Sequence, residues 1–114
     1  MTRRKRGRRA LARRYGCFRL PKIRGAHVSE AKQKDVSWLA RTDPKAKTIE
    51  FSEAFDRLSP EGKRYIAEHE ATHLKTGTDH NAAFYAELRR RIKKKKIDWE
   101  IAYELEAWNC HKTN

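Results

Sequence analysis

The sequence predicts one small α+β domain, in which a β-sheet of about three strands packs against three helices. Three observations support this prediction. Short segments of strand character precede Ser59, whereas apolar residues after Ser59 recur at the three- and four-residue spacings of amphipathic helices. A chain of 114 residues has room for one domain with one small core, which excludes multidomain enzymes and large barrels.

The positive charge of the chain is concentrated at its N-terminus. The sequence has 28 Lys and Arg against 15 Asp and Glu, a formal charge of +13, and residues 1–14 hold eight of these cations and no acid. Such a segment cannot bury enough apolar surface to fold alone. We therefore expect residues 1–14 to form a disordered arm and residues 15–114 to form the domain. The arm is a candidate for nonspecific contact with nucleic acid; the alternative is a solvated arm without such a role.

Neither a signal peptide nor a transmembrane segment is expected. No apolar run approaches about 18 residues, and no apolar stretch of signal-peptide length follows the basic arm. We expect a soluble, cytoplasmic protein whose cysteines, Cys17 and Cys110, are reduced. Cys17 is interpreted as a small buried residue and His27 as a loop residue.

The first half of the domain is expected to supply the sheet. Residues 15–22 are aromatic-rich and are interpreted as a short edge strand or a loop. Residues 35–41 and 45–52 predict a β-hairpin, because the intervening residues 42–44 (Thr-Asp-Pro) are a turn signal. The side chains expected on its buried side are Val36, Trp38, Ile49 and Phe51.

The second half is expected to supply three helices. Ser59 followed by proline predicts a helix that runs to about Lys75 and is ended by Gly77. A second helix should restart at residues 79–81 and end in the charge run at 89–96. Asp98 is the expected N-cap of a third helix, which precedes a tail of residues 109–114. The apolar residues of these two helices are Phe84, Tyr85, Leu88 and Ile92, followed by Ile101, Ala102, Leu105 and Trp108.

The first of these helices carries the zincin motif HExxH at residues 69–73. Residues four apart share a helix face, so His69 and His73 can bind one ion from the same side, with Glu70 beside them. Zinc held by two imidazoles and a third ligand keeps a position for water and lowers the pKa of that water, whose proton a carboxylate can take. A random shuffle would show this pattern with a probability of about 2%. The alternative is that these histidines are ordinary residues of an amphipathic helix.

His80 is the candidate third ligand, because the glycine that ends the helix lets the chain fold back towards the same ion. Residues 69–85 (HEATHLKTGTDHNAAFY) resemble the HExxH segment, with downstream histidine and aromatic, of minigluzincins and of SprT-like and WLM metalloproteases. The length favours minigluzincins, soluble domains related to the catalytic domains of integral-membrane metallopeptidases.

The resemblance covers residues 59–114 and implies a minimal zincin fold. It implies one Zn²⁺ per chain held by His69, His73 and His80, with Glu70 as general base and Phe84 as a packing residue. The sequence departs from these families at two points. The spacer before His80 is one residue longer than in WLM proteins, and no four-cysteine zinc ribbon follows as in many SprT-like proteins.

Two further features of the C-terminal region follow from the same resemblance. Related gluzincins take a glutamate ligand from a later helix, which makes Glu104 an alternative third ligand; otherwise Glu104 is a solvated carboxylate. Minigluzincins resemble zymogens, so Cys110 or His111 in the tail is a candidate ligand that would keep the enzyme latent. The tail would act within a monomer or across a tail-swapped dimer, unless it is a frayed polar terminus.

The sequence therefore predicts a zinc-dependent metallopeptidase of the HExxH endopeptidase type that acts on a peptide or protein substrate. We expect a strand from residues 45–52 to bind the substrate backbone by β-augmentation. The alternative function is a nucleic-acid-associated basic protein with a structural zinc or none. The charge run at 89–96 fits this alternative, although it lacks the interleaved aromatic residues on which bases would stack.

Overall fold

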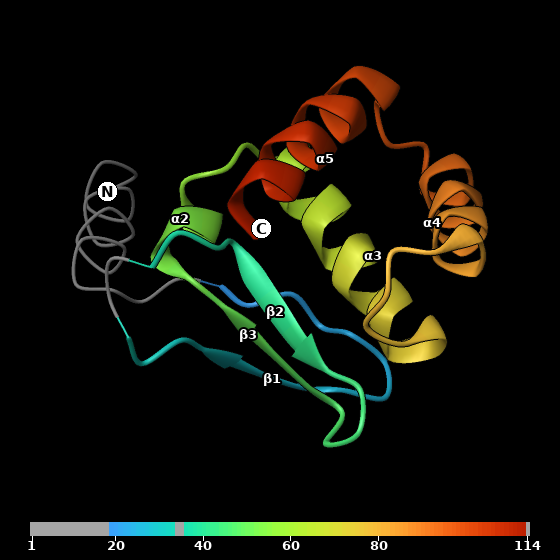
Figure 1. Ribbon diagram of the computed structural model, residues 1–114. Helices are drawn as coiled ribbons and strands as arrows, with labels where there is room; N and C mark the ends of the chain where they lie inside the picture. Colours follow the sequence, from blue (N-terminus) through green and yellow to red (C-terminus); the bar gives the residue numbers. More distant parts are fainter. Residues whose placement is uncertain (1–18, 34–35, 114) are drawn as a thin grey trace, which may run out of the picture.

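The sheet has three strands, and their order decides which of them is accessible at an edge. The computed structural model describes residues 19–33 and 36–113, with side chains as far as residue 107. The strands are β1 (His27–Glu30), β2 (Ala40–Asp43) and β3 (Thr48–Phe51). They lie in the order β1-β3-β2, with β1 parallel and β2 antiparallel to β3 (Figure 1). β3 is therefore the central strand and β2 is an edge strand.

The predicted hairpin is confirmed, but its turn lies further along the chain than expected. The turn occupies residues 44–47 instead of 42–44. The Asp43 carboxylate accepts hydrogen bonds from the backbone N–H groups of Lys45 (3.0 Å) and Ala46 (3.2 Å), which fixes the turn after this residue. Thr42 and Asp43 consequently remain in the strand.

Two of the four side chains predicted for the buried side of the hairpin are buried. Ile49 and Phe51 are fully buried, as expected. Val36 and Trp38 are half-buried and precede β2, so the prediction that they share this side is wrong. The shift of the strand also brings Leu39 into the core, where its exposed fraction is 3%.

β1 was not predicted. Of the residues 15–22 interpreted as an edge strand or loop, 15–18 lie outside the described part of the chain and 19–22 form no strand. His27, expected in a loop, begins β1 instead. β1 pairs directly with β3, although β2 lies between them in the sequence. Four residues of mixed exposure carry no pattern that would reveal such a nonlocal pairing.

The three predicted helices are confirmed together with their capping residues. They are α3 (Pro60–Thr76), α4 (Ala82–Lys95) and α5 (Trp99–Thr113). The Ser59 hydroxyl accepts from the Gly62 N–H (3.1 Å), and the Asn81 side-chain oxygen accepts from the Phe84 N–H (3.0 Å). Gly77 ends α3 at φ 105°, a backbone conformation that favours glycine.

Two features of the helices differ from the prediction. A one-turn helix, α2 (Glu53–Asp56), follows β3 and was not expected. The backbone of α5 remains helical through residues 109–113, where a tail was predicted. No glycine or proline interrupts residues 99–113, so the sequence contains no signal that would end this helix earlier.

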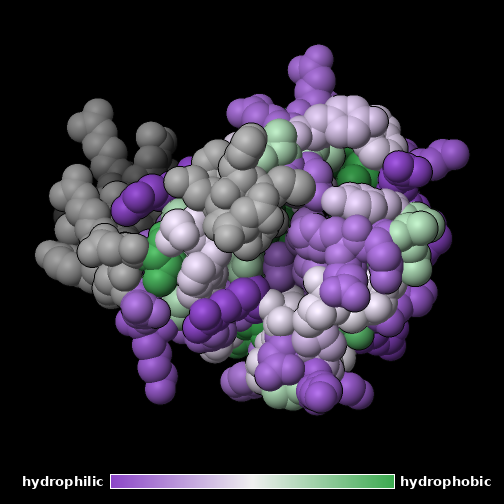
Figure 2. Space-filling view, viewed as in Figure 1, coloured by the Kyte–Doolittle hydropathy of each residue, from purple (hydrophilic) through white to green (hydrophobic). Residues whose placement is uncertain are grey.

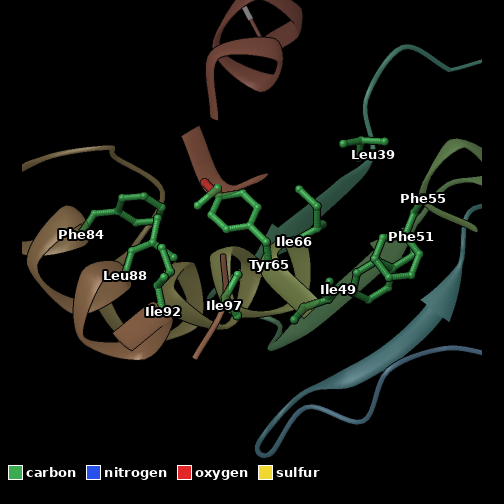
Figure 3. Close-up of a cluster of buried hydrophobic side chains, with 11 residues drawn as sticks. Leu39, Ile49, Phe51, Phe55, Tyr65, Ile66, Phe84, Leu88, Ile92 and Ile97 are labelled. Carbon is green, nitrogen blue, oxygen red and sulfur yellow. The ribbon is translucent and has the colours of Figure 1, made fainter. Parts of the chain in front are cut away.

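α3 is the central helix, since it contacts α4, α5 and β2. In Figure 1, α3, α4 and α5 gather on one side of the sheet. Figure 3 shows Tyr65 and Ile66 of α3 between two groups of core side chains, one on α4 and one on the sheet and α2. The labelled members of these groups are Phe84, Leu88 and Ile92 on α4, and Ile49, Phe51 and Phe55 on the other side. The segment that carries HExxH is therefore held from both sides.

The surface seen in Figure 2 is mainly hydrophilic, and strongly hydrophobic side chains show only in small areas between polar ones. Among the described residues, no helix has the length and apolar composition that crossing a membrane requires. Residues 1–14, interpreted as a basic arm, lie outside the described residues.

Candidate metal centre

Three histidines converge where the end of α3 meets the start of α4. His69 and His73 stand one helical turn apart on α3, with exposed fractions of 1% and 8%. Gly77 ends the helix, and the chain then returns so that His80 lies against both rings. One potential ligand atom from each histidine lies within 4.8 Å of the others. The structure thus brings together the three residues that the sequence analysis selected as metal ligands.

His73 is oriented by the backbone that ends its own helix. Its Nδ1 lies 2.8 Å from the Gly77 carbonyl oxygen, which can only accept a hydrogen bond, so Nδ1 carries the proton. Nε2 of His73 then carries a lone pair, and it lies within hydrogen-bond distance (3.1 Å) of Nε2 of His80. Burial lowers the pKa of His73 to about 4, in spite of the opposing hydrogen bond to Gly77. The ring is therefore neutral at neutral pH, the form that binds metals.

His69 presents an unpaired nitrogen to the same place. Its Nε2 is buried and has no hydrogen-bond partner among the described residues. A buried polar atom without a partner costs free energy, so such atoms are rare unless a ligand or an ion completes them. Phe84 lies against all three imidazoles, with ring centroids 4.5–5.0 Å away, and excludes water from that side. This donor set fits zinc, which takes neutral imidazole nitrogens as ligands.

Glu70 is a buried carboxyl group at the edge of the cluster. Its exposed fraction is 3%, and one of its oxygens lies 4.0 Å from Nε2 of His69. The Thr42 hydroxyl on β2 donates a hydrogen bond to the other oxygen (2.7 Å). Burial raises the pKa of Glu70, and the nearby His69 and the Thr42 hydrogen bond offset this only in part. A carboxyl group with a raised pKa beside a metal-binding cluster is suited to proton transfer.

A cleft of about 370 Å³ opens onto these side chains. Its walls are the histidine cluster with Glu70, the loop residues Thr78 and Asp79, and Ala40, Arg41 and Thr42 of β2. β2 is an edge strand, so its outer backbone groups face no other strand of the described residues. The prediction that residues 45–52 would bind a substrate strand is wrong, because β3 is paired on both edges.

No family model matches the chain, and no curated protein matches it either. Among solved structures, the chain is similar to the crystal structure of the metallopeptidase zymogen abylysin from Pyrococcus abyssi. The two share 30% sequence identity at a TM-score of 0.52, over 73% of this chain and 81% of that chain. This chain belongs to the abylysin family of metallopeptidases. Its three-stranded mixed sheet and helices form a small zincin-like α+β fold.

In this member of the abylysin family, the site contains a carboxylate that sequence reasoning missed. Glu106 of α5 lies 3.4 Å from Nδ1 of His69, and it accepts hydrogen bonds from the hydroxyls of Tyr65 and Tyr85. Burial alone would raise its pKa, but the hydrogen bonds of His69 and Tyr65 and the charge of His69 hold the pKa at about 2. Glu106 is therefore an ionised carboxylate that faces the back of His69.

Glu104, the predicted alternative ligand, is exposed on α5 and does not belong to the histidine cluster. A signal for Glu106 was present in the sequence. Glu106 follows the buried Ala102 by one helical turn and so shares its face of α5, whereas Glu104 is half a turn away from Ala102. The side chains of Cys110 and His111, the proposed latency ligands, lie outside the described residues.

Proposed function

We propose that this chain is a zinc-dependent metallopeptidase that hydrolyses peptide bonds in peptide or protein substrates. The observation that carries the proposal is the convergence of His69, His73 and His80 around the unpaired Nε2 of His69, with Glu70 adjacent. The similarity to a metallopeptidase zymogen supports the same reaction class. On this proposal the chain is a minigluzincin-type enzyme, related to the SprT-like and WLM proteases.

The three histidines would hold one Zn²⁺. Zinc bound there would polarise the scissile carbonyl and lower the pKa of a water molecule. A structural zinc site is closed by four protein ligands, whereas the cluster found among the described residues offers three. This count favours a catalytic site over the structural zinc of the alternative function.

Glu70 would act as the general base and then as the general acid. Thr42 holds one carboxylate oxygen through its hydrogen bond, so the rotation of the Glu70 side chain is restricted. Glu70 would take a proton from the attacking water and pass it to the nitrogen of the leaving amine. The raised pKa of Glu70 fits this exchange, because a stronger base takes the first proton more readily.

Glu106 would act as a positioning residue for His69. Its negative charge favours a proton on Nδ1 of His69, which leaves the lone pair on Nε2 directed at the metal position. The hydroxyls of Tyr65 and Tyr85 hold the Glu106 carboxylate in place. The orientation of His69 is therefore determined by a network that joins α3, α4 and α5.

The substrate would bind along β2. An extended peptide could pair by β-augmentation with the edge of β2 that is unpaired among the described residues, which would place a peptide carbonyl beside Glu70. Main-chain hydrogen bonds of this type recognise an extended backbone without requiring one side chain. Unfolded segments of proteins are therefore the expected class of substrate.

The test separates metal binding from catalysis. Glu70→Gln should retain zinc while losing hydrolysis of a fluorogenic peptide by about 10²–10⁴-fold, the usual contribution of general acid–base assistance. His80→Ala should lose zinc affinity, and Glu104→Ala should not. Undiminished turnover by zinc-loaded Glu70→Gln would overturn the mechanism. Full zinc retention by His80→Ala would move the third-ligand role to another residue.

Latency is the second part of the proposal. The related structure is that of a zymogen, and residues 109–113 of this chain form the last part of the helix that carries Glu106. Residues 109–114, with Cys110 and His111 as potential ligands, would cover the cleft within a monomer or from a neighbouring chain. The oligomeric state and the cytoplasmic location stay predictions.

A further inference from the structure

A second concave surface lies on the side of α3 that faces away from the histidines. Residues 68, 71 and 75 recur at three- and four-residue spacings and share one face of α3, whereas residues 69, 70 and 73 point in the opposite direction. The first group lines a groove of about 540 Å³, together with residues of α4, the segment before β1 and the β2–β3 turn. The groove is thus separate from the proposed active site.

The groove is strongly basic. Seven of its twelve lining residues are Lys or Arg, and one is acidic. Four of these cations come from α4, and the other three are spread over three further segments. The α4 cations are Arg90, Arg91, Lys94 and Lys95, and the others are Arg24, Lys47 and Lys75. The charge run of α4 therefore lies beside cations that are distant in the sequence. A helix face that is merely solvated would need no such cations beside it.

The acids near the groove neutralise only part of this charge. Glu87 pairs with Lys75 (3.4 Å), Arg90 (2.7 Å) and Arg91 (2.9 Å), and Glu68 pairs with Arg91 (3.2 Å). The remaining groove cations have no ion pair within the described part of the chain; they are Arg24, Lys47, Lys94 and Lys95. The groove consequently has a net positive charge that an anionic ligand could neutralise.

Lys47 occupies its position at a conformational cost. It ends the β2–β3 turn at φ 57°, in the left-handed region where glycine or asparagine is the usual residue. The Lys47 carbonyl accepts a hydrogen bond from the His27 N–H (2.9 Å), which ties the turn to the first residue of β1. Turn stability does not favour lysine at this position, so the charge of Lys47 is the property that bears on the groove.

The shape and composition of the groove favour a polymer of phosphates. The groove is concave, which suits a curved, linear ligand better than a flat membrane surface. It contains no aromatic residue on which a base would stack. The exposed large hydrophobic residues of the described chain, Trp99 and Tyr103, lie on α5 and do not line it. A second basic hollow that includes Arg19 shares two lining residues with the groove, so the basic surface extends towards the N-terminal segment.

We propose that this groove binds the phosphate backbone of double-stranded nucleic acid without reading its sequence. Cations one helical turn apart on α4 would contact phosphates along one strand, and Lys47 with Arg24 would contact the same backbone from the opposite wall. This proposal does not depend on the peptidase activity, because the two sites share no residue.

The decisive comparison uses two double variants of α4 in the full-length protein. Lys94→Gln/Lys95→Gln removes two groove cations, whereas Arg89→Gln/Lys93→Gln removes two exposed cations that do not line the groove. Binding is measured by fluorescence anisotropy with a labelled 20-base-pair DNA duplex over a series of salt concentrations. The groove variant should bind severalfold more weakly, and its salt slope should fall by about 1.8, or about 0.9 for each lost phosphate contact. The control variant should retain the slope of the wild type.

Two single variants distinguish a binding role from a structural one. Lys47→Gly should weaken DNA binding while the melting temperature stays the same or rises, because glycine relieves the left-handed backbone. Glu87→Gln should strengthen binding, because it releases three groove cations from their ion pairs.

Three outcomes would overturn the proposal. They are absence of DNA binding at low salt, equal losses in the two double variants, and preferential binding of phosphatidylglycerol vesicles over DNA. Equal losses would assign the affinity to net charge and the N-terminal arm, and vesicle preference would assign the groove to a lipid surface.

Discussion

At the residue scale, Glu104 and Glu106 are two glutamates on one helix with different environments. Glu106 contacts Nδ1 of His69 and two tyrosine hydroxyls, whereas Glu104 is exposed. Glu106→Gln would remove the charge that favours the metal-binding tautomer of His69. We expect it to lower zinc affinity by about 10–100-fold, the usual effect of losing a carboxylate behind a metal-binding histidine.

The matched control for this prediction is Glu104→Gln, which makes the same chemical change on the same helix. Zinc affinity is measured by competition with a chromogenic chelator, and the melting temperature of the metal-free proteins reports any loss of folding. Equal zinc affinities of the two variants would show that Glu106 does not position His69.

At the scale of one element, Glu87 joins α4 to α3. The hydrogen bond from Arg90, followed by the charges of Arg90, Lys75 and Arg91, lowers the pKa of Glu87 to about 2. Since the pKa is higher in the unfolded chain, acidification favours unfolding. The contribution of Glu87 to stability is complete above its ordinary pKa of 4.5 and is lost as the pH falls towards 2.

Glu87→Gln should therefore lower the free energy of unfolding at pH 7 by about 0.5–1 kcal/mol, as expected for a surface network of ion pairs. The variant should also lose less stability than the wild type between pH 6 and pH 3. Urea unfolding of the metal-free proteins at several pH values measures both effects, with Glu104→Gln as the control. Parallel pH profiles of wild type and Glu87→Gln would contradict this account.

At the scale of the whole molecule, α5 connects the histidine cluster with the C-terminal residues. α5 carries Glu106 to the histidine cluster, and its backbone continues to Thr113. We expect removal of residues 109–114 to raise peptidase activity, because it would uncover the cleft. The measurement is kcat/KM on a fluorogenic peptide, with zinc content determined in parallel. Unchanged activity in a truncated protein that retains its zinc would argue against latency through this segment.

The sequence by itself determined the features that depend on neighbours in the chain. The hydrogen bonds of a helix fix the spacing of its side chains, so HExxH placed His69 and His73 on one face before any tertiary contact was known. The capping residues Ser59, Gly77 and Asn81 act within one turn, and the helix ends they predicted are confirmed. The return of His80 followed from the position of Gly77.

Only the tertiary structure decided the features that depend on distant segments. The pairing of β1 with β3 makes β2 the edge strand at the cleft. Residues 45–52, expected to bind a substrate strand, contribute the central strand β3 instead. Thr42 reaches Glu70 across 28 residues, and Glu106 reaches His69 from another helix. The basic groove likewise joins Lys47 to the cations of α4. Such contacts form because burying the core brings these elements together, and packing of this kind leaves no fixed spacing in the sequence.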